Sequence, residues 1–295
     1  RLIGRRFRLA HVKFGNEIIE VSNFRAPHHT SDVGGQSEDG RIIRDNVYCN
    51  IDDDVWRRDF TVNALFYDIE NFSIIDYVGG IRDIEAKQIR LIGNPTERYR
   101  EDPVRMLRAI RFAAKLGFTI SSDTSNPREA MAELLNDISE ARLYEEFNKL
   151  FMNGAGHKTF SYFYKTSLFG ILFPEVNQFL SSFPKSSELF DNALNNTDAR
   201  IKENLPVTPA FVIAALLWPL IRSRANEYQA NGVTETDAIH LAGDAVISRQ
   251  VKTVAMPRRI TLIAREIWAL QSRLKNRRGK RPMRLVGHPR FRAAF

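Results

Sequence analysis

EDPVRMLRAIRFAAKL, residues 101–116, is the stretch that decides what kind of fold this chain has. Its apolar positions recur every three or four residues and Pro103 suits a first helical turn, so the stretch predicts a helix over 103–116. From Pro95 onward the periodicities are almost all helical, with further apolar stripes over 143–151 and 260–274. The chain beyond Pro95 is therefore predicted to be helical throughout.

The residues before Pro95 have a different pattern. Two short runs, 5–14 and 17–24, flank Gly15-Asn16 and predict a β-hairpin. The other elements that we expect are a long polar loop, a short helix and two strands, at residues 25–54, 60–67, 72–76 and 88–92. The expected fold class is α+β: a β-containing head, a helical neck and a helical body, over residues 1–92, 93–153 and 154–295.

Charge is distributed unevenly along the 295 residues. The 43 basic side chains exceed the 35 acidic ones by eight. Residues 249–295 hold 14 of the basic side chains and one acid, Glu266, which leaves 29 basic against 34 acidic side chains elsewhere. A basic segment on a mildly acidic body indicates a polyanionic partner, most simply a nucleic acid. The alternative is a basic tail that only aids solubility.

Composition excludes several classes of protein. At 43% hydrophobic and 26% charged residues the chain is not intrinsically disordered. Its longest apolar stretch, 210–221, contains Pro219 and is predicted to be a buried helix rather than a membrane span. Cys49 is the single cysteine, so no internal disulfide can form and a reducing cytoplasm is expected.

The densest group of polar side chains is RRDFTVNAL, residues 57–65. Guanidinium groups bind phosphate oxygens bidentately, while a carboxylate or an amide can bind sugar hydroxyls. We therefore expect Arg58, Asp59 and Asn63 to hold the triphosphate and ribose of a nucleotide. The alternative is a surface ion pair beside a helix.

A second group lies on the helix predicted over 103–116. Arg105, Arg108 and Arg111 fall within about a third of its circumference, and Asp102 precedes Arg105 by one turn. An acceptor and a donor held on one face match the N6–H and N1 positions of adenine. The alternative is an exposed Asp102–Arg105 ion pair that has no ligand.

Three weaker signals complete the inventory. Glu20, in the predicted hairpin, is either a solvent-facing residue or one carboxylate of a metal site. Residues 52–54, DDD, resemble a metal motif but are interpreted as a solvated acidic patch in a loop. An aromatic run over 160–173 suits core packing better than base stacking. Phosphate contacts without sequence preference are expected from a basic run: Lys275, Arg277, Arg278, Lys280, Arg281 and Arg284.

The order of these motifs resembles the class II nucleotidyltransferases, the family of bacterial poly(A) polymerases and tRNA CCA-adding enzymes. The resemblance rests on RRDFTVNA, DYVGG, RLIGNP and RYREDPVRMLRAIRF, at 57–64, 76–80, 90–95 and 98–112. GRRFRLAHV at 4–12 and the closing GKR…HPRFRAA at 279–294 are closer to the poly(A) polymerase branch.

The resemblance implies a polymerase-β-like head and a reaction that adds AMP from ATP to RNA 3′ ends with the help of two Mg²⁺ ions. It places Arg58, Asp59 and Asn63 at the ribose and triphosphate, Asp102 and Arg105 near the base, and Glu20 as a third carboxylate. Arg142, in SEARL at 139–143, would brace the nucleotide pocket, and the basic tail would hold RNA. A cytoplasmic bacterial monomer is expected.

In this family the paired aspartates that bind magnesium precede the hairpin, and they are not among the 295 residues. We therefore expect an N-terminally truncated and nearly inactive chain. A tRNA CCA-adding activity and a non-catalytic RNA-binding module are the alternatives. The whole interpretation depends on one expectation: that the two polar groups, far apart in the sequence, converge in space around a single purine ligand.

Overall fold

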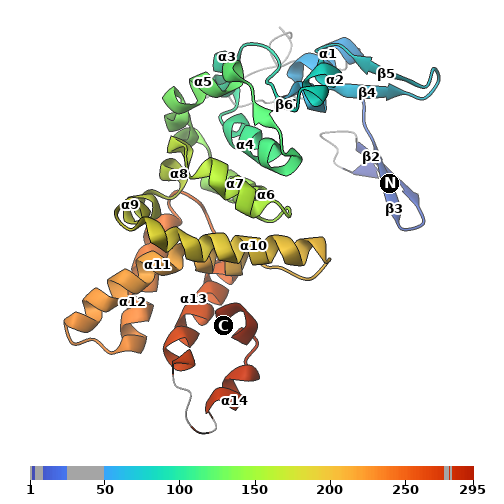
Figure 1. Cartoon of the computed structure of the whole chain (residues 1–295). Helices are drawn as coiled ribbons and strands as arrows, with labels where there is room; N and C mark the ends of the chain where they lie inside the picture. Colours follow the sequence, from blue (N-terminus) through green and yellow to red (C-terminus); the bar gives the residue numbers. More distant parts are fainter. Residues whose placement is uncertain (1, 4–8, 25–49, 276–278, 280) are drawn as a thin grey trace. The chain divides into compact units, whose positions relative to one another are not determined.

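The computed structural model describes residues 2–3, 9–24, 50–275, 279 and 281–295 (Figure 1). These residues form two compact units. The first comprises the described residues up to Arg98 together with Ser121–Thr124, and the second comprises Tyr99–Ile120 and Ser125–Phe295. The division into head, neck and body at residues 92 and 153 stays a prediction.

A small antiparallel sheet opens the first unit. Its strand order is β1-β2-β3, and the strands cover Leu2–Ile3, Leu9–Phe14 and Glu17–Val21. Phe14 pairs with Glu17 across the Gly15-Asn16 turn, where Gly15 has a φ of 58°. The predicted hairpin is therefore confirmed.

The rest of the first unit alternates short helices and strands. Its elements are α1 (Ile51–Arg57), the 3-10 turn η1 (Thr61–Asn63), β4 (Leu65–Asp68), β5 (Ser73–Asp76), α2 (Gly80–Glu85) and β6 (Gln88–Ile89). β4 and β5 form an antiparallel hairpin in which Leu65 pairs with Asp76. The strands expected over 72–76 and 88–92 are present, although the second is shorter than predicted.

The helix predicted over 60–67 is wrong. Phe60 forms a β-bridge with Leu91, one 3-10 turn follows, and Leu65 begins strand β4. The β-branched residues Thr61 and Val62 lower the helix propensity at this point, and the bridge to Leu91 is a contact that local periodicity does not reveal.

Part of the expected loop is also helical. Residues 25–49 of it lie outside the described residues, but α1 begins at Ile51. Asn50 caps this helix, because its Oδ1 accepts from the Asp53 backbone N–H at 3.0 Å. Acidic side chains in the first turn also favour a helix N-terminus, so the DDD run starts a helix rather than continuing a loop.

The core of this part of the first unit is small and tightly built. Val55, Ala64 and Ile92 are buried together, with Phe66 and Val78 packed against them. Gly80 begins α2 where a Cβ atom would lie 2.4 Å from the Thr61 carbonyl oxygen. A glycine is therefore required for α2 to approach η1 this closely.

The second unit is helical apart from the two-residue strand β7, Thr119–Ile120, within the residues that the structure describes. α3 and α5, at Pro95–Glu101 and Ser122–Ala130, each run from one unit into the other. The remaining helices are α4 (Val104–Leu116), α6 (Glu140–Phe151), α7 (Gly156–Phe163), α8 (Ser167–Leu172), α9 (Pro174–Ser182), α10 (Glu188–Lys202), α11 (Pro209–Ala230), α12 (Glu235–Gln250), α13 (Arg258–Leu274), α14 (Arg281–Val286) and α15 (Phe291–Ala294). The 3-10 turns η2 and η3 cover Ala132–Asp137 and Pro184–Ser187. The helices predicted around α4, α6 and α13 are confirmed.

Phenylalanines fill the centre of this unit. Phe160, Phe163, Phe169 and Phe173 are each at most 2% exposed. Phe160 and Phe169 meet edge to face with ring centroids 5.7 Å apart, a favourable aromatic geometry. Core packing, rather than base stacking, is therefore confirmed for these four side chains, whereas Tyr162 is 46% exposed.

The long helix α11 organises the C-terminal part of the unit. It packs against α10, α12 and α13, and Trp268 of α13 donates its indole N–H to the Ala214 carbonyl at 3.0 Å. At Gly243 of α12 a Cβ atom would lie 3.2 Å from the Trp268 ring, so the small residue allows the close approach. The helix predicted over 210–221 is present and buried, and it continues through Pro219. Among the described residues, none of the helices combines the length and the hydropathy of a membrane span.

Candidate nucleotide-binding site

A buried aspartate holds the two arginines of the RRDF motif. The Asp54 carboxylate is only 3% exposed, and its two oxygens lie 2.8 Å from Arg57 Nε and 3.0 Å from Arg58 Nε. Arg57 and Arg58 are about one third exposed, at 30% and 36%. Asp54 therefore neutralises one face of each guanidinium group and fixes both near the surface, where their terminal nitrogens can reach an anion.

The three predicted residues of this motif adjoin one another. Arg58 Nη1 donates to the Asn63 carbonyl at 2.8 Å, and its guanidinium carbon lies 4.6 Å from the Phe66 ring centroid. Asn63 Nδ2 donates to Asp59 Oδ1 at 3.0 Å. The structure thus brings Arg58, Asp59 and Asn63 together as a half-buried polar group next to η1.

Arg98 fixes the backbone of the motif from a distant position in the sequence. Its Nη2 lies 2.6 Å from the Arg58 carbonyl oxygen and 3.1 Å from that of Arg57. Asn94 caps α3 by accepting from the Thr96 N–H at 2.9 Å, so the RLIGNP motif starts the helix that carries Arg98. Sequence reasoning misses both roles: the DDD run gives no sign that Asp54 is buried, and RYREDPVRMLRAIRF contains Arg98 without indicating that it binds the backbone of residues 57 and 58.

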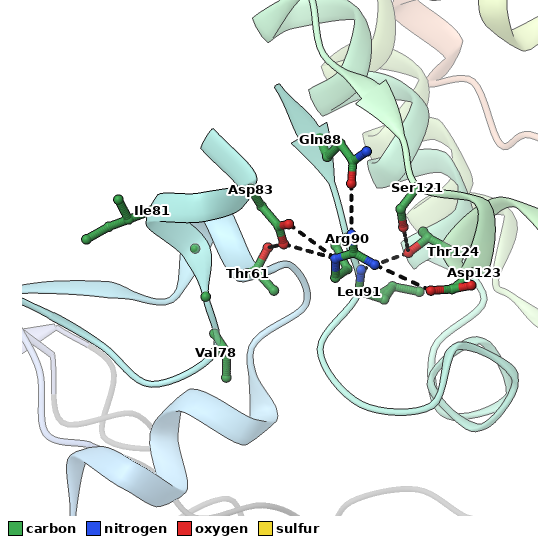
Figure 2. Close-up of polar contacts among 12 residues, drawn as sticks. Thr61, Val78, Ile81, Asp83, Gln88, Arg90, Leu91, Ser121, Asp123 and Thr124 are labelled. Carbon is green, nitrogen blue, oxygen red and sulfur yellow. Dashed lines mark hydrogen bonds and ion pairs between the residues drawn. The ribbon is translucent and has the colours of Figure 1, made fainter. Parts of the chain in front are cut away.

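A buried polar cluster holds residues 60–61, within the RRDF motif and just after it. Figure 2 shows the Asp83 carboxylate between Thr61, whose hydroxyl donates to it at 2.7 Å, and Arg90, whose Nε lies 3.2 Å from it. Asp83 is 1% exposed, so these donors take the place of water around its carboxylate oxygens. In the same view Leu91 donates its backbone N–H to the Thr124 hydroxyl at 2.9 Å. The cluster therefore ties residues 60–61 to 90–91 next to the arginine pair.

The DYVGG motif is a helix cap. The Asp76 carboxylate accepts from the backbone N–H groups of Val78, Gly79, Gly80 and Ile81 at distances from 2.9 to 3.2 Å. Burial raises the pKa of the Asp76 carboxyl, but these four donors outweigh burial and leave the pKa below its ordinary value. The motif is explained by the start of α2 and needs no ligand.

The second polar group lies in the helical unit. Asp102 Oδ2 is 2.8 Å from Arg142 Nη2 of α6, and Asp102 Oδ1 accepts from the Val104 N–H at 3.2 Å. Arg105 pairs with Glu101 instead, at 2.8 Å. Each residue of the expected Asp102–Arg105 pair thus has a different charged partner, because Arg142 reaches Asp102 from another helix.

The other arginines of α4 lie beside an aromatic ring. The guanidinium carbons of Arg108 and Arg111 are 5.4 Å and 4.7 Å from the Phe112 ring centroid. Both side chains are half-buried, as is Arg105, so this stripe of α4 is less exposed than a solvated face. On α6, Glu146 is buried and pairs with Lys149 at 2.7 Å.

Metal binding finds little support in the described residues. Glu20 is 64% exposed on β3 and lies 3.1 Å from His11 Nε2 of β2. No group of three His, Cys, Asp or Glu side chains that could hold a metal ion exists within the part of the chain that the structure describes. One carboxylate beside a histidine does not fit a magnesium site, which needs several oxygen ligands.

The basic run lies near the end of the second unit. Lys275 is 71% exposed and pairs with Glu235, and Arg284 is exposed on α14. Arg281 begins α14, whereas Arg277, Arg278 and Lys280 lie outside the described residues.

Solved structures show the class of fold. The chain superposes on a structure described as a tRNA-processing enzyme complex with a TM-score of 0.64 and 20% identity, over 98% of this chain and 70% of that one. A tRNA nucleotidyltransferase with a primer tRNA and an incoming ATP analog gives a TM-score of 0.59 and 20% identity, over 96% and 74%. The fold is therefore that of the tRNA nucleotidyltransferases, in agreement with the predicted α+β class.

Sequence relatives narrow this class to one family. The chain is 46% identical over its whole length to Poly(A) polymerase I of Escherichia coli O6:H1 and spans 65% of that protein. It is 43% identical to Poly(A) polymerase I of Haemophilus influenzae and spans 67% of that protein. A shorter match, 35% identical, relates 54% of this chain to 38% of the CCA-adding enzyme of Bacillus subtilis. The chain belongs to the poly(A) polymerase family.

Three family models match separate parts of the chain. Residues 1–90 match the poly(A) polymerase head domain, and residues 117–180 match a probable RNA and SrmB-binding site of polymerase A. Residues 231–295 match the arginine-rich C-terminus of polymerase A. The basic segment singled out by charge coincides with this last region.

Proposed function

We propose that this chain carries the nucleotide- and RNA-binding parts of an enzyme that adds AMP from ATP to RNA 3′ ends. The observation that carries the proposal is the arginine pair braced by Asp54 inside RRDFTVNA, in a chain 46% identical throughout to a Poly(A) polymerase I. The chain spans about two thirds of such relatives.

Each polar group has a role in this proposal. Arg57 and Arg58 bind the β- and γ-phosphates, while Asp59 and Asn63 bind the ribose hydroxyls. Asp102, held by Arg142, and Arg105 face the adenine base, with Arg108 and Arg111 adding positive charge along α4. This assignment needs the two groups to meet around one nucleotide, which stays a prediction.

The reaction is an in-line displacement. The 3′-oxygen of the RNA attacks the α-phosphorus of ATP, a new P–O bond forms, and the bond to the bridging oxygen breaks so that pyrophosphate leaves. The proton of the 3′-hydroxyl passes to solvent or to a base. The arginines contribute by binding the triphosphate and by neutralising charge on the departing pyrophosphate.

RNA is the proposed polymeric partner. The basic run from Lys275 to Arg284 and the match to a probable RNA-binding region support this partner. Because these cations carry no aromatic neighbours between 275 and 284, we expect binding to phosphates without sequence preference. The single cysteine and the bacterial relatives support the cytoplasm as the compartment.

The test is primer extension by the full-length gene product. We expect an oligo(A) primer to be lengthened with ATP and Mg²⁺, and CTP to be incorporated poorly. Addition of CTP to a tRNA that lacks its terminus would instead identify a CCA-adding enzyme. RNA binding with no nucleotide addition would identify a non-catalytic module and overturn the proposal.

A further inference from the structure

A cavity of about 450 Å³ lies in the helical unit, and none of the residues assigned to the nucleotide above lines it. Its walls come from α10, the loop before α11, the start of α11, α13 and the C-terminal turn α15, which pack together in this unit. Cavities of roughly 300 to 1,000 Å³ are the usual size of small-molecule sites. The space suits a single nucleotide.

The charge that lines this cavity is all positive. Arg200, Arg290 and Arg292 line it, and no acidic side chain does. Glu266 pairs with Arg290 at 2.8 Å and offsets that charge. Arg200 donates to the Pro206 carbonyl from Nη2 at 3.0 Å, and this neutral acceptor orients the guanidinium group without cancelling its charge. The cavity therefore attracts an anion.

The rest of the lining is apolar or neutral. Val207, Phe211 and Ile263 line the cavity and are only half-buried, so they present apolar surface next to the arginines. Asn196, exposed on α10, adds an amide at the same cavity. A ligand that satisfies both kinds of surface needs an anionic group joined to a flat apolar one.

We propose that this cavity binds one nucleotide of a single-stranded RNA, with its phosphate at Arg292 and Arg290 and its base against Phe211 and Ile263. A nucleotide combines a phosphate with a base whose faces pack on apolar and aromatic side chains. An RNA strand is favoured over a free nucleotide because the segment 249–295, which forms part of the cavity, contains 14 basic side chains and only one acidic one. Such an excess of positive charge attracts a polyanion. The choice of RNA rests on the proposed function.

The test measures binding of a fluorescein-labelled A12 RNA to the full-length protein by anisotropy at several salt concentrations. Arg292→Ala removes one cation, and Asn196→Glu places a carboxylate at the cavity. The matched controls are Arg259→Ala, an exposed arginine of α13, and Asn195→Glu, an exposed neighbour on α10, neither of which lines the cavity. Thermal unfolding checks that all four variants fold.

We expect Arg292→Ala to weaken A12 binding about fivefold and to lower the slope of log K against log salt by about 0.7, the loss of one single-strand phosphate contact. Asn196→Glu should weaken binding about tenfold or more, while both controls stay within about twofold of wild type. AMP at 1 mM should not displace A12.

Equal losses in Arg292→Ala and Arg259→Ala would mean that general charge, not the cavity, binds RNA, and would overturn the inference. Displacement of A12 by AMP would show that the cavity takes free nucleotides and would overturn the strand assignment. Primer extension by wild type separates the two proposals. If wild type extends the primer but both cavity variants bind A12 as well as wild type does, only the cavity as an RNA site is rejected. If the cavity variants lose A12 binding but wild type does not extend the primer, only the proposed function is rejected.

Discussion

The Asp102 carboxylate and the Arg142 guanidinium, forty residues apart in the sequence, lie 2.8 Å from one another. The pair joins the start of α4 to the start of α6, and it gives Asp102 a partner other than Arg105. Since Arg142 is 46% exposed, the pair contributes little to stability, about 1 kcal/mol at most. In the proposed site, we expect the pair to orient the Asp102 carboxylate towards the base of the nucleotide.

Arg142→Ala should therefore impair nucleotide use more than stability. We expect the KM for ATP to rise about tenfold, because Asp102 loses the donor that orients it, while the free energy of unfolding changes by less than about 1 kcal/mol. Primer extension by the full-length gene product over a range of ATP concentrations measures the KM, and chemical denaturation measures the stability. Arg128→Ala, in the same helical unit, is the control. A large loss of stability with an unchanged KM would contradict this role.

Asp54→Asn should destabilise the first unit and weaken triphosphate binding. Asp54 is 3% exposed, and the neutral amide leaves both arginine partners without their carboxylate, so a loss of roughly 2 kcal/mol is expected. Denaturant unfolding and ATP binding measure the change. Asp53→Asn, one residue earlier on α1, should cost about 0.5 kcal/mol through the helix dipole alone. Equal effects of the two substitutions would show that Asp54 has no special position.

Asp76 should make stability depend on pH in the acidic range. Its pKa is lowered in the folded state, so its contribution is fully present above the unfolded value of 3.8 and is lost as the pH falls through the folded pKa. Asp76→Asn should cost about 1 kcal/mol at pH 6 and less at pH 3. Denaturant melts at both pH values test this, with the exposed Glu85→Gln as the control. A cost that is the same at both values would refute the assignment.

Gly80→Ala should disrupt the packing of α2 on η1. A Cβ atom at Gly80 would lie 2.4 Å from the Thr61 carbonyl oxygen, a backbone atom that cannot move aside without moving η1. We expect a loss of about 2 kcal/mol or more in denaturant unfolding. Gly287→Ala should be close to neutral, because a Cβ atom there would lie 3.8 Å from the nearest atom, the Arg284 carbonyl oxygen. A Gly80→Ala protein as stable as wild type would show that the backbone yields at little cost.

Local sequence patterns predicted the helices well. The stripes of α4, α6 and α13 arise from residues three and four apart, and these periodicities survive in any fold that buries one face. The same reasoning failed over 60–67, where the bridge between Phe60 and Leu91 imposes extended backbone. The interpretation of the DDD run as a solvated loop was also wrong, because Asp54 is buried whereas Asp52, two residues earlier, is exposed.

The sequence by itself determined the class of chain, its helical C-terminal part, its basic end and the motifs that mark its family. Each of these follows from residue types and from spacings of a few residues. Only the tertiary structure decided that Asp54 holds both arginines, that Arg98 binds their carbonyl groups and that Arg142 pairs with Asp102. Ion pairs between distant residues depend on how elements pack, and burial decides which of several neighbouring charges needs a partner.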